Sequence, residues 1–241
     1  MKTFRSFVFA FAVLFCTVTV SSQTADEIIN KYIQAVGGTD LLTKITSVYT
    51  ESTMDVMGMQ GTIKTTTLNG KGMKQVMDIS GSLISTCYTD KGGWSINPMA
   101  GGTSAVDMPE GQYNSGKEQI IVGAPFINYA EKGYKAELIG TEAVGNINAY
   151  KINMTSPENI SSLYYFDPNT SYLIKSVQEI EMEGQMIDNV INYSDYRLTD
   201  GYTAPYKMGM VIAGGQFTMS MTVTKVELNK PVDEAIFAKP Q

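Results

Sequence analysis

Residues 216–228 read QFTMSMTVTKVEL, and their composition alternates with a period of two. Every second position is apolar, at Phe217, Met219, Met221 and Val223. The positions between them carry threonine or serine as far as Thr224. Side chains that alternate in this way point to opposite faces of a β-strand, so one face is dry and the other is wet. This stretch therefore predicts an antiparallel strand that covers an apolar interior.

The same signal recurs along most of the chain, interrupted by glycine and by turn residues. It predicts strands at 46–57, 61–69, 72–79, 83–89, 136–144, 147–154, 161–167, 171–183, 185–193, 206–213 and 216–228. Asp167-Pro168-Asn169 is typical of a turn between two of them, since proline presets φ. About eleven strands with short links indicate one large curved sheet or open barrel. We expect an α+β, mainly β fold, namely a half-open antiparallel β-barrel.

Two segments interrupt the strand pattern. Thr24 and Glu27 form a capping-box signature ahead of apolar residues at helical spacing, and Gly37-Gly38 ends the predicted helix. Residues 39–44 add a further helical turn. Residues 97–132 are richer in proline and glycine and predict a loop with one or two short helices, which we expect to form a lid over the concave face.

The N-terminus has the composition of a secretory signal peptide. Lys2 and Arg5 precede the apolar stretch 7–20, and cleavage is expected after Ser22, which leaves one domain over residues 23–241. Lipidation of Cys16 is the alternative, but a lipobox has a small residue where Phe15 stands. With Cys16 removed, Cys87 has no disulfide partner, and we expect a buried thiol in a strand.

Composition excludes several classes of function. The chain has 18 basic and 24 acidic residues, for a net charge of −6, which argues against nucleic-acid binding. Histidine is absent, so Ser-His-Asp catalysis and His-ligated metals are excluded. Residues 111–117 match a phosphate-binding loop as far as Lys117, but Glu118 follows where a hydroxyl is required. Glu179, Glu181 and Glu183 share one strand face and indicate a solvated edge. We expect no enzyme activity and no cofactor.

The dry face is rich in methionine, an unbranched and polarizable side chain that adapts to irregular apolar ligands such as acyl chains. One helix cannot cover the concave face of eleven strands, so the remainder needs a lid, a partner or a ligand. The alternative is that these residues fill the core, which Trp94 in particular would suit. The predicted lipid-binding lining comprises Met54, Val56, Met73, Met77, Trp94, Ile120, Ile121, Phe126, Ile180, Met182, Met208, Met210, Phe217, Met219 and Met221.

Tyrosines at 193, 196, 202 and 206 cluster around an expected turn. Such a cluster is typical either of half-buried strand ends or of a surface that binds carbohydrate or a protein partner.

Several segments together resemble one family, the LolA-like outer-membrane lipoprotein-sorting proteins. They are residues 25–29, 35–38, 133–140, 149–152, 164–167, 193–197, 200–201 and 237–240, together with Pro205. The resemblance implies a periplasmic, half-open barrel closed by helices, whose apolar cavity holds the acyl chains of a lipoprotein or lipid. It also implies inner- and outer-membrane partner proteins, and neither catalysis nor a cofactor.

One departure from that family concerns its lid. Carriers of this type hold the lid with an arginine on an early strand, but the only arginine after the signal segment is Arg197. We therefore assign no family lid residue to this chain. Two alternatives to a carrier stay open at this point: an envelope interaction module whose cavity is filled by its own lid, and a histidine-free hydrolase built on Glu179 and Glu181.

Overall fold

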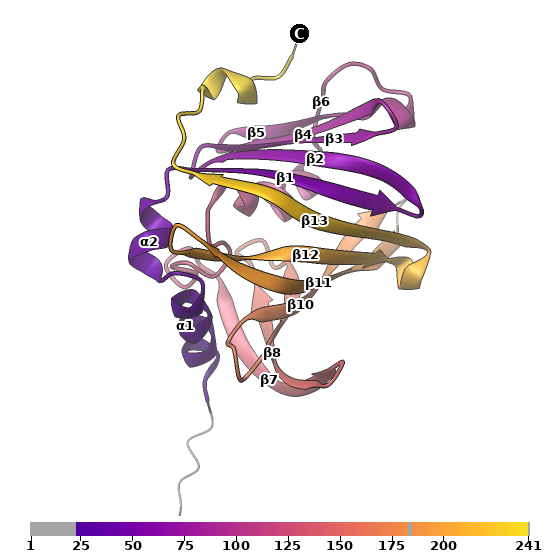
Figure 1. The fold of residues 1–241 in the computed structure, drawn as a ribbon. Coiled ribbons are helices and arrows are strands. Elements are labelled where there is room, and N and C mark those ends of the chain that lie inside the picture. The colour runs from indigo at the N-terminus through magenta and orange to yellow at the C-terminus, as the bar shows by residue number, and fades with distance from the viewer. Residues whose placement is uncertain (1–22, 183–184, 241) are drawn as a thin grey trace, which may run out of the picture.

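The computed structural model describes residues 23–182 and 185–240, and the expected signal peptide lies outside them. Within that part of the chain, 13 strands form a single sheet (Figure 1). The strands are β1 (Ser47–Val56), β2 (Met59–Leu68), β3 (Gly72–Ile79), β4 (Ser82–Thr89), β5 (Gly92–Ile96), β6 (Val106–Asp107), β7 (Lys135–Val144), β8 (Ile147–Thr155), β9 (Ser161–Phe166), β10 (Leu173–Met182), β11 (Gln185–Thr199), β12 (Tyr202–Ile212) and β13 (Phe217–Leu228). The helices are α1 (Ala25–Ala35), α2 (Thr39–Lys44), α3 (Glu110–Gly116) and the short 3₁₀ turns η1 (Pro98–Ala100), η2 (Lys117–Ile120), η3 (Ala213–Gly215) and η4 (Glu234–Phe237).

The strand order is β6-β5-β4-β3-β2-β1-β13-β12-β11-β10-β9-β8-β7, and the pairs are antiparallel. All neighbours are consecutive along the chain except β1 and β13, which join the two halves. β6 and β7 lie at the two ends of the order, so the sheet is open. The α+β, mainly β fold with one open antiparallel sheet is therefore confirmed.

Two strands, β5 and β6, were not predicted from the sequence, and β11 and β12 are longer than predicted. β5 contains Gly92 and Gly93, and β6 is two residues long, so neither carries a clear alternating pattern. β11 and β12 extend to a tight turn at Asp200 and Gly201, where both residues have positive φ (48° and 86°). An Asp-Gly pair is a strong hairpin signal, and the predicted strands 185–193 and 206–213 stopped short of it.

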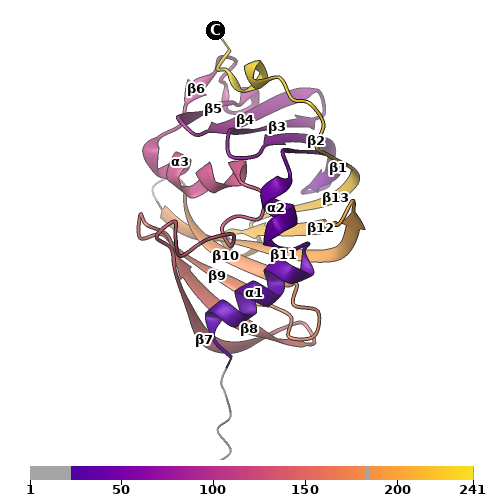
Figure 2. The same ribbon diagram turned by 90° about the vertical axis from the view of Figure 1, so that its left-hand side faces the viewer.

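Helix α1 forms as expected. The Thr24 side chain accepts a hydrogen bond from the Glu27 N–H, and the Glu27 carboxylate accepts one from the Thr24 N–H at 3.1 Å, so the capping box is complete. Ile28, Ile29 and Ile33 are buried in the main core cluster, which also contains side chains from β8, β9 and β10. Figure 2 shows α1 lying across the β7–β11 half of the sheet. The apolar helix face therefore covers only part of the dry sheet face.

The C-terminal segment covers the outer face of the other half of the sheet, on the side opposite to Tyr88 and the lid residue Ile120. The backbone carbonyl of Phe237 accepts a hydrogen bond from Trp94 Nε1 at 2.9 Å and lies 3.5 Å from Cys87 Sγ. Cys87, Trp94 and Phe237 form one buried cluster. Gly72 permits this contact, since a Cβ there would lie 2.8 Å from the Phe237 ring. The expected buried, unpaired Cys87 is confirmed.

Burial raises the pKa of the Cys87 thiol to about 11, with Lys74 opposing the shift. At pH 8 the folded protein should therefore react with a thiol reagent at least tenfold more slowly than the urea-unfolded chain, because the thiolate is the reactive form. Phe237→Ala, which removes the covering ring, should increase the labelling rate, whereas Leu198→Ala at an exposed site should not. Equal labelling of folded and unfolded protein would contradict this assignment.

Candidate functional site

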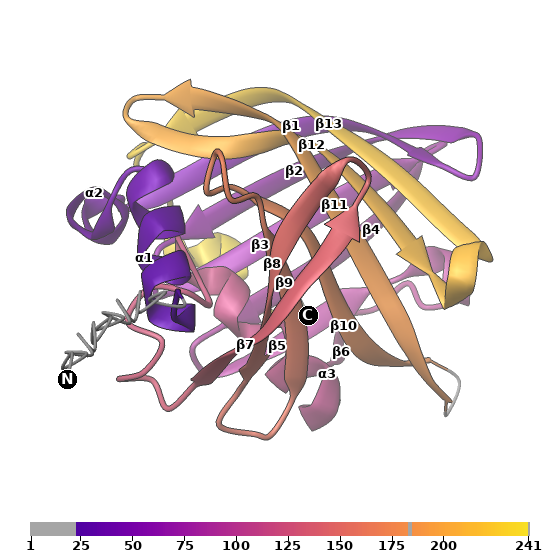
Figure 3. The ribbon, with the colours of Figure 1, turned by 90° about the horizontal axis from the view of Figure 1, so that it is seen from below.

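The inner face of the sheet encloses a cavity of about 580 Å³. Its wall takes residues from β2 and β3 on one side of the β1–β13 pair and from β8 to β12 on the other. Strands so far apart in the order meet at one cavity only because the sheet curves around it (Figure 3). The side that the sheet leaves open is covered by parts of segment 114–126. The curved sheet and this segment therefore leave an interior space.

Methionines form one wall of the cavity. Met208 and Met210 on β12 stand directly opposite Met221 and Met219 on β13. Met77 on β3 contributes from the other half of the sheet. All five are only partly buried because their inner surfaces face the cavity. Such side chains adapt to the shape of an apolar ligand.

Seven of the predicted lining residues border the cavity, and the others do not. Those that line the cavity are Met77, Ile121, Phe126, Met208, Met210, Met219 and Met221. Six others pack in core clusters instead. Met54, Val56 and Phe217 belong to one cluster, Met73 and Ile120 to a second, and Trp94 to a third. Ile180 is partly buried but does not border the cavity, and the Met182 side chain lies outside the described residues. The lipid-binding role of the lining residues stays a prediction.

Only the second half of segment 97–132 lies over the cavity. Met99 is exposed at η1, and Met108 packs against Tyr88 and Tyr113. From Asn114 onward, backbone and side chains border the cavity. Gly116 is essential to this approach, since a Cβ there would lie 2.3 Å from the Tyr88 ring on β4. The lid is therefore shorter than the sequence predicted.

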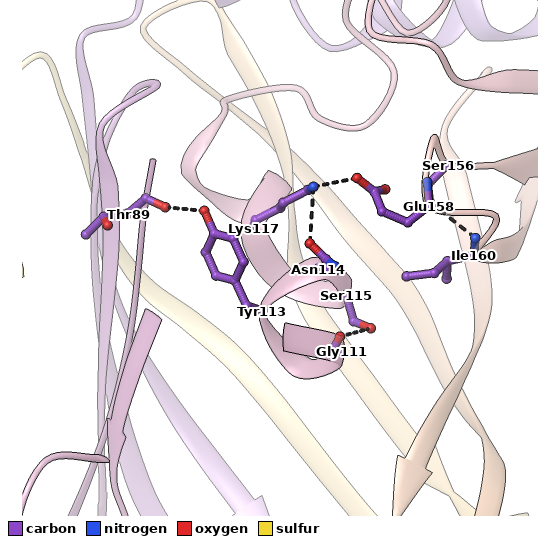
Figure 4. A network of polar contacts seen from close by, with 9 residues as sticks. All are labelled: Thr89, Gly111, Tyr113, Asn114, Ser115, Lys117, Ser156, Glu158 and Ile160. Carbon is purple, nitrogen blue, oxygen red and sulfur yellow. Dashed lines mark hydrogen bonds and ion pairs between the residues drawn. The ribbon is translucent and has the colours of Figure 1, made fainter. Parts of the chain in front are cut away.

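Polar contacts attach this lid to both halves of the sheet (Figure 4). The Tyr113 hydroxyl donates to the Thr89 carbonyl at the end of β4, at 2.9 Å. Lys117 Nζ pairs with Glu158 Oε1 at 2.5 Å, in the turn between β8 and β9. The pairing with Lys117 lowers the pKa of Glu158. α3 and η2 therefore connect β4 with the β8–β9 turn across the open side of the sheet, whose edge strands are β6 and β7.

Three of the four clustered tyrosines are part of the core, and Tyr206 lies instead under Arg197 on the other side of the β11–β12 hairpin. Tyr193, Tyr196 and Tyr202 pack against the cluster that contains α1, next to Tyr32. The Tyr196 hydroxyl donates to the Leu173 carbonyl at 2.6 Å, and its ring stacks on Tyr172 at 4.1 Å. These side chains hold α1 on the sheet, so they do not form the carbohydrate or partner surface that was one reading of the sequence.

Arg197 takes no part in the cavity. It pairs with Asp195 at 2.7 Å and lies over the Tyr206 ring on the solvent-exposed side of the β11–β12 hairpin. In this chain Lys117 is one of several attachments of the lid. The Gly70 N–H donates to the Ile120 carbonyl at 2.8 Å, and the Val122 N–H donates to Asn69 Oδ1 at 3.0 Å. A lysine in a Gly-Lys pair was visible in the sequence, but its partner Glu158 is 41 residues away and nothing in the pattern connects them.

The structure gives no support to the motifs that suggested chemistry. Residues 110–116 form helix α3 rather than a loop around a phosphate. Glu179 is exposed on β10, the Glu181 side chain lies outside the described part, and so does Glu183. Among the described residues, no group of three or more Asp, Glu or Cys side chains is placed to hold a metal ion. No helix within residues 23–182 and 185–240 is long and apolar enough to cross a membrane.

Comparison with known proteins identifies the class of fold. No family model and no curated protein matches the sequence. Among solved structures, a DUF1329 family protein from Desulfovibrio piger aligns at a TM-score of 0.61 and 12% identity, over 90% of this chain and 98% of that one. A LolA superfamily protein from Nitrosomonas europaea aligns at 0.58 and 13% identity, over 90% and 99%. An outer membrane lipoprotein-sorting protein domain from Vibrio parahaemolyticus aligns at 0.56 and 12%, over 88% and 95%.

This chain therefore has the LolA-like fold, as the resemblance in its sequence predicted. At 12–13% identity the likeness establishes the fold alone. What the cavity holds has to be argued from its own side chains.

Lys117→Met should increase hydrogen–deuterium exchange at residues 110–120 several-fold, because it removes the ion pair that attaches η2 to the turn between β8 and β9. The free energy of unfolding should fall by less than about 1 kcal/mol, as for other partly exposed ion pairs. Lys225→Met, which removes ion pairs to Glu51 and Glu227 on the outer side of β1 and β13, is the matched control and should leave exchange in α3 unchanged. Unchanged exchange in Lys117→Met would show that the ion pair does not hold the lid.

The buried tyrosines predict a loss of stability in alkali. Burial raises the pKa of Tyr32 and Tyr202 above the ordinary value of 10.0, which the unfolded chain retains. Above pH 10 the unfolded state loses these protons and the folded state does not, so the free energy of unfolding should fall by about 1.4 kcal/mol per pH unit for each such tyrosine. Urea denaturation at pH 9 to 11 measures this slope. Tyr32→Phe should reduce it, and an unchanged slope would contradict the assignment.

Proposed function

We propose that this chain is a non-enzymatic periplasmic carrier that holds the acyl chains of a lipoprotein or lipid in the cavity. The observation that carries the proposal is the cavity of about 580 Å³ with a methionine wall on β12 and β13. Its volume falls within the roughly 300–1,000 Å³ of known ligand sites. A protein without a ligand would be expected to fill its interior with its own side chains. Here the interior keeps a space that a ligand can occupy.

The energetics suit reversible transport. Burial of a sixteen-carbon chain gains on the order of 12 kcal/mol, at about 0.8 kcal/mol per methylene. Association costs roughly 4–15 kcal/mol in lost freedom. The two nearly balance, so a soft apolar wall binds a chain without a charged anchor and still allows its release.

Delivery and release require access to the cavity and partners on either side. The lid formed by α3 and η2 borders the cavity and is attached by partly exposed polar contacts, which are weak enough to break and re-form. A cleaved signal at residues 1–22 would place the chain in the periplasm, between an inner-membrane donor and an outer-membrane acceptor. The fold shared with a lipoprotein-sorting domain supports this placement.

The interaction-module alternative has less support. It requires that the lid fill the interior, whereas Ile121, Phe126 and the neighbouring lid residues leave about 580 Å³ open. The hydrolase alternative has no cluster of carboxylates in the described part of the cavity wall, where Glu118 is the acidic residue.

Met210→Trp should weaken binding of a fluorescent fatty acid at least tenfold, because the larger ring occupies the space between β12 and the lid. Met57→Trp makes the same substitution at a methionine that is 61% exposed in the β1–β2 turn, and should leave binding unchanged. Fluorescence titration of both variants and the parent protein provides the comparison, with circular dichroism to confirm the fold.

Two outcomes would contradict the carrier proposal. One is the absence of fatty-acid uptake by the parent protein, together with native mass spectra that show no co-purified lipid. The other is equal loss of binding in Met210→Trp and Met57→Trp.

A further inference from the structure

The cavity has a second wall of different chemistry. Ser162 on β9 stands opposite Gln178 on β10, and Gln178 stands opposite Asn189 on β11. These three side chains therefore form a row across adjacent strands on the inner face, and all three border the cavity. On β12 the same row continues as Ile212, where the apolar wall begins. We call Ser162, Gln178 and Asn189 the polar row.

One atom of the polar row has an unmet hydrogen-bonding requirement. Asn189 Oδ1 is buried and, within the described structure, has no hydrogen-bond partner. Buried polar groups are almost always paired, because desolvation without a partner is costly. An unpaired amide oxygen at the wall of a ligand-sized cavity indicates that the partner arrives with the ligand.

The neighbouring hydroxyls are already engaged. Ser176, one row away on β10 and 8% exposed, lies 3.0 Å from the Tyr193 hydroxyl. Ser162 is 9% exposed and is hydrogen-bonded to Tyr164. Neither is placed to satisfy Asn189 within the protein. The polar row therefore places the unpaired Asn189 amide oxygen beside the buried Ser162 hydroxyl, with the buried Ser176 hydroxyl one row away.

We propose that the cavity selects a lipid whose hydrocarbon chain carries a hydroxyl group, which binds at Asn189. This rests on the carrier function proposed above and specifies its ligand class. A hydroxyl both donates and accepts, so it satisfies the Asn189 amide in either orientation. An unsubstituted chain leaves the amide unpaired, while the methionines on β12 and β13 hold the rest of either chain equally well.

The sign of the effect makes the proposal testable. In a wholly apolar cavity, an added hydroxyl weakens binding because it loses its water without compensation. At Asn189 it gains a partner, and the same hydroxyl strengthens binding. An amide N–H on a lipid is also a donor, so the experiment includes one to separate the two sources of this chemistry.

The experiment is competition against a bound fluorescent fatty acid, with the mature chain as it exists. The probes are palmitate and 3-hydroxypalmitate, stearate and 12-hydroxystearate, and palmitamide, which has an amide N–H and no hydroxyl, as the amide donor. We expect at least one hydroxylated chain to compete fivefold or more better than its unsubstituted counterpart, and better than the amide. In Asn189→Leu this preference should disappear or reverse, while the unsubstituted chains bind as well as before or better.

Asn192→Leu is the matched control, since Asn192 lies on the same strand but is exposed on the outer face opposite Gly209. It should keep the preference of the parent protein. If Asn189→Leu does not fold, Gln178→Leu tests the same row from the adjacent strand.

The possible failures are distinguishable. If the parent protein binds unsubstituted chains as well as or better than hydroxylated ones, the selectivity is overturned and the carrier function stands. If Asn189→Leu prefers hydroxylated chains as strongly as the parent protein does, the role of Asn189 is overturned. The partner of the Asn189 amide is then water. Superior competition by palmitamide assigns the site to an amide lipid and overturns the hydroxyl. No competition by any chain overturns the carrier function itself.

Discussion

The pairing of β1 with β13 is the contact on which the rest of the structure depends. It is the one junction in the described sheet between strands that are not consecutive in sequence, and it joins the β1–β6 half to the β7–β13 half. Met54 and Val56 stand opposite Met221 and Met219, so the dry faces of both halves become continuous. Long-range pairing of this kind carries a large loop-closure cost, which the shared apolar face repays only when both halves are present.

An open sheet of this size has more apolar surface than its helices cover. α1 covers the inner face over β7–β11, whereas Phe237 covers the outer face over β3–β5. Between them, α3 and η2 lie over the cavity and are attached to β4 through Tyr113 and to the β8–β9 turn through Lys117. The contacts that close the cavity are thus weaker than those that build the sheet. A carrier requires this division, because its lid must move while its wall stays intact.

The cavity wall combines two requirements of transport. The methionines of β12 and β13 form an adaptable apolar wall, and in the selectivity that we propose the polar row on β9 to β11 supplies the hydrogen bond. Both follow from the register of neighbouring strands, which places residues of like character side by side on the inner face. In the carrier that we propose, β12 and β13 provide the affinity and β9 to β11 provide the selectivity.

The local structure could be predicted from the sequence, because period and turn chemistry are properties of a few adjacent residues. The alternation in 216–228, the Thr24–Glu27 capping box and the Cys87 strand position were all sufficient for correct predictions. Which inward side chains line the cavity, and which are buried under other residues, depends on the tertiary structure. Met54 and Met221 are cross-strand partners on the same face, yet Met54 is buried in a core cluster and Met221 lines the cavity. The physical reason is that burial depends on what packs above a residue, and those contacts come from segments distant in the chain.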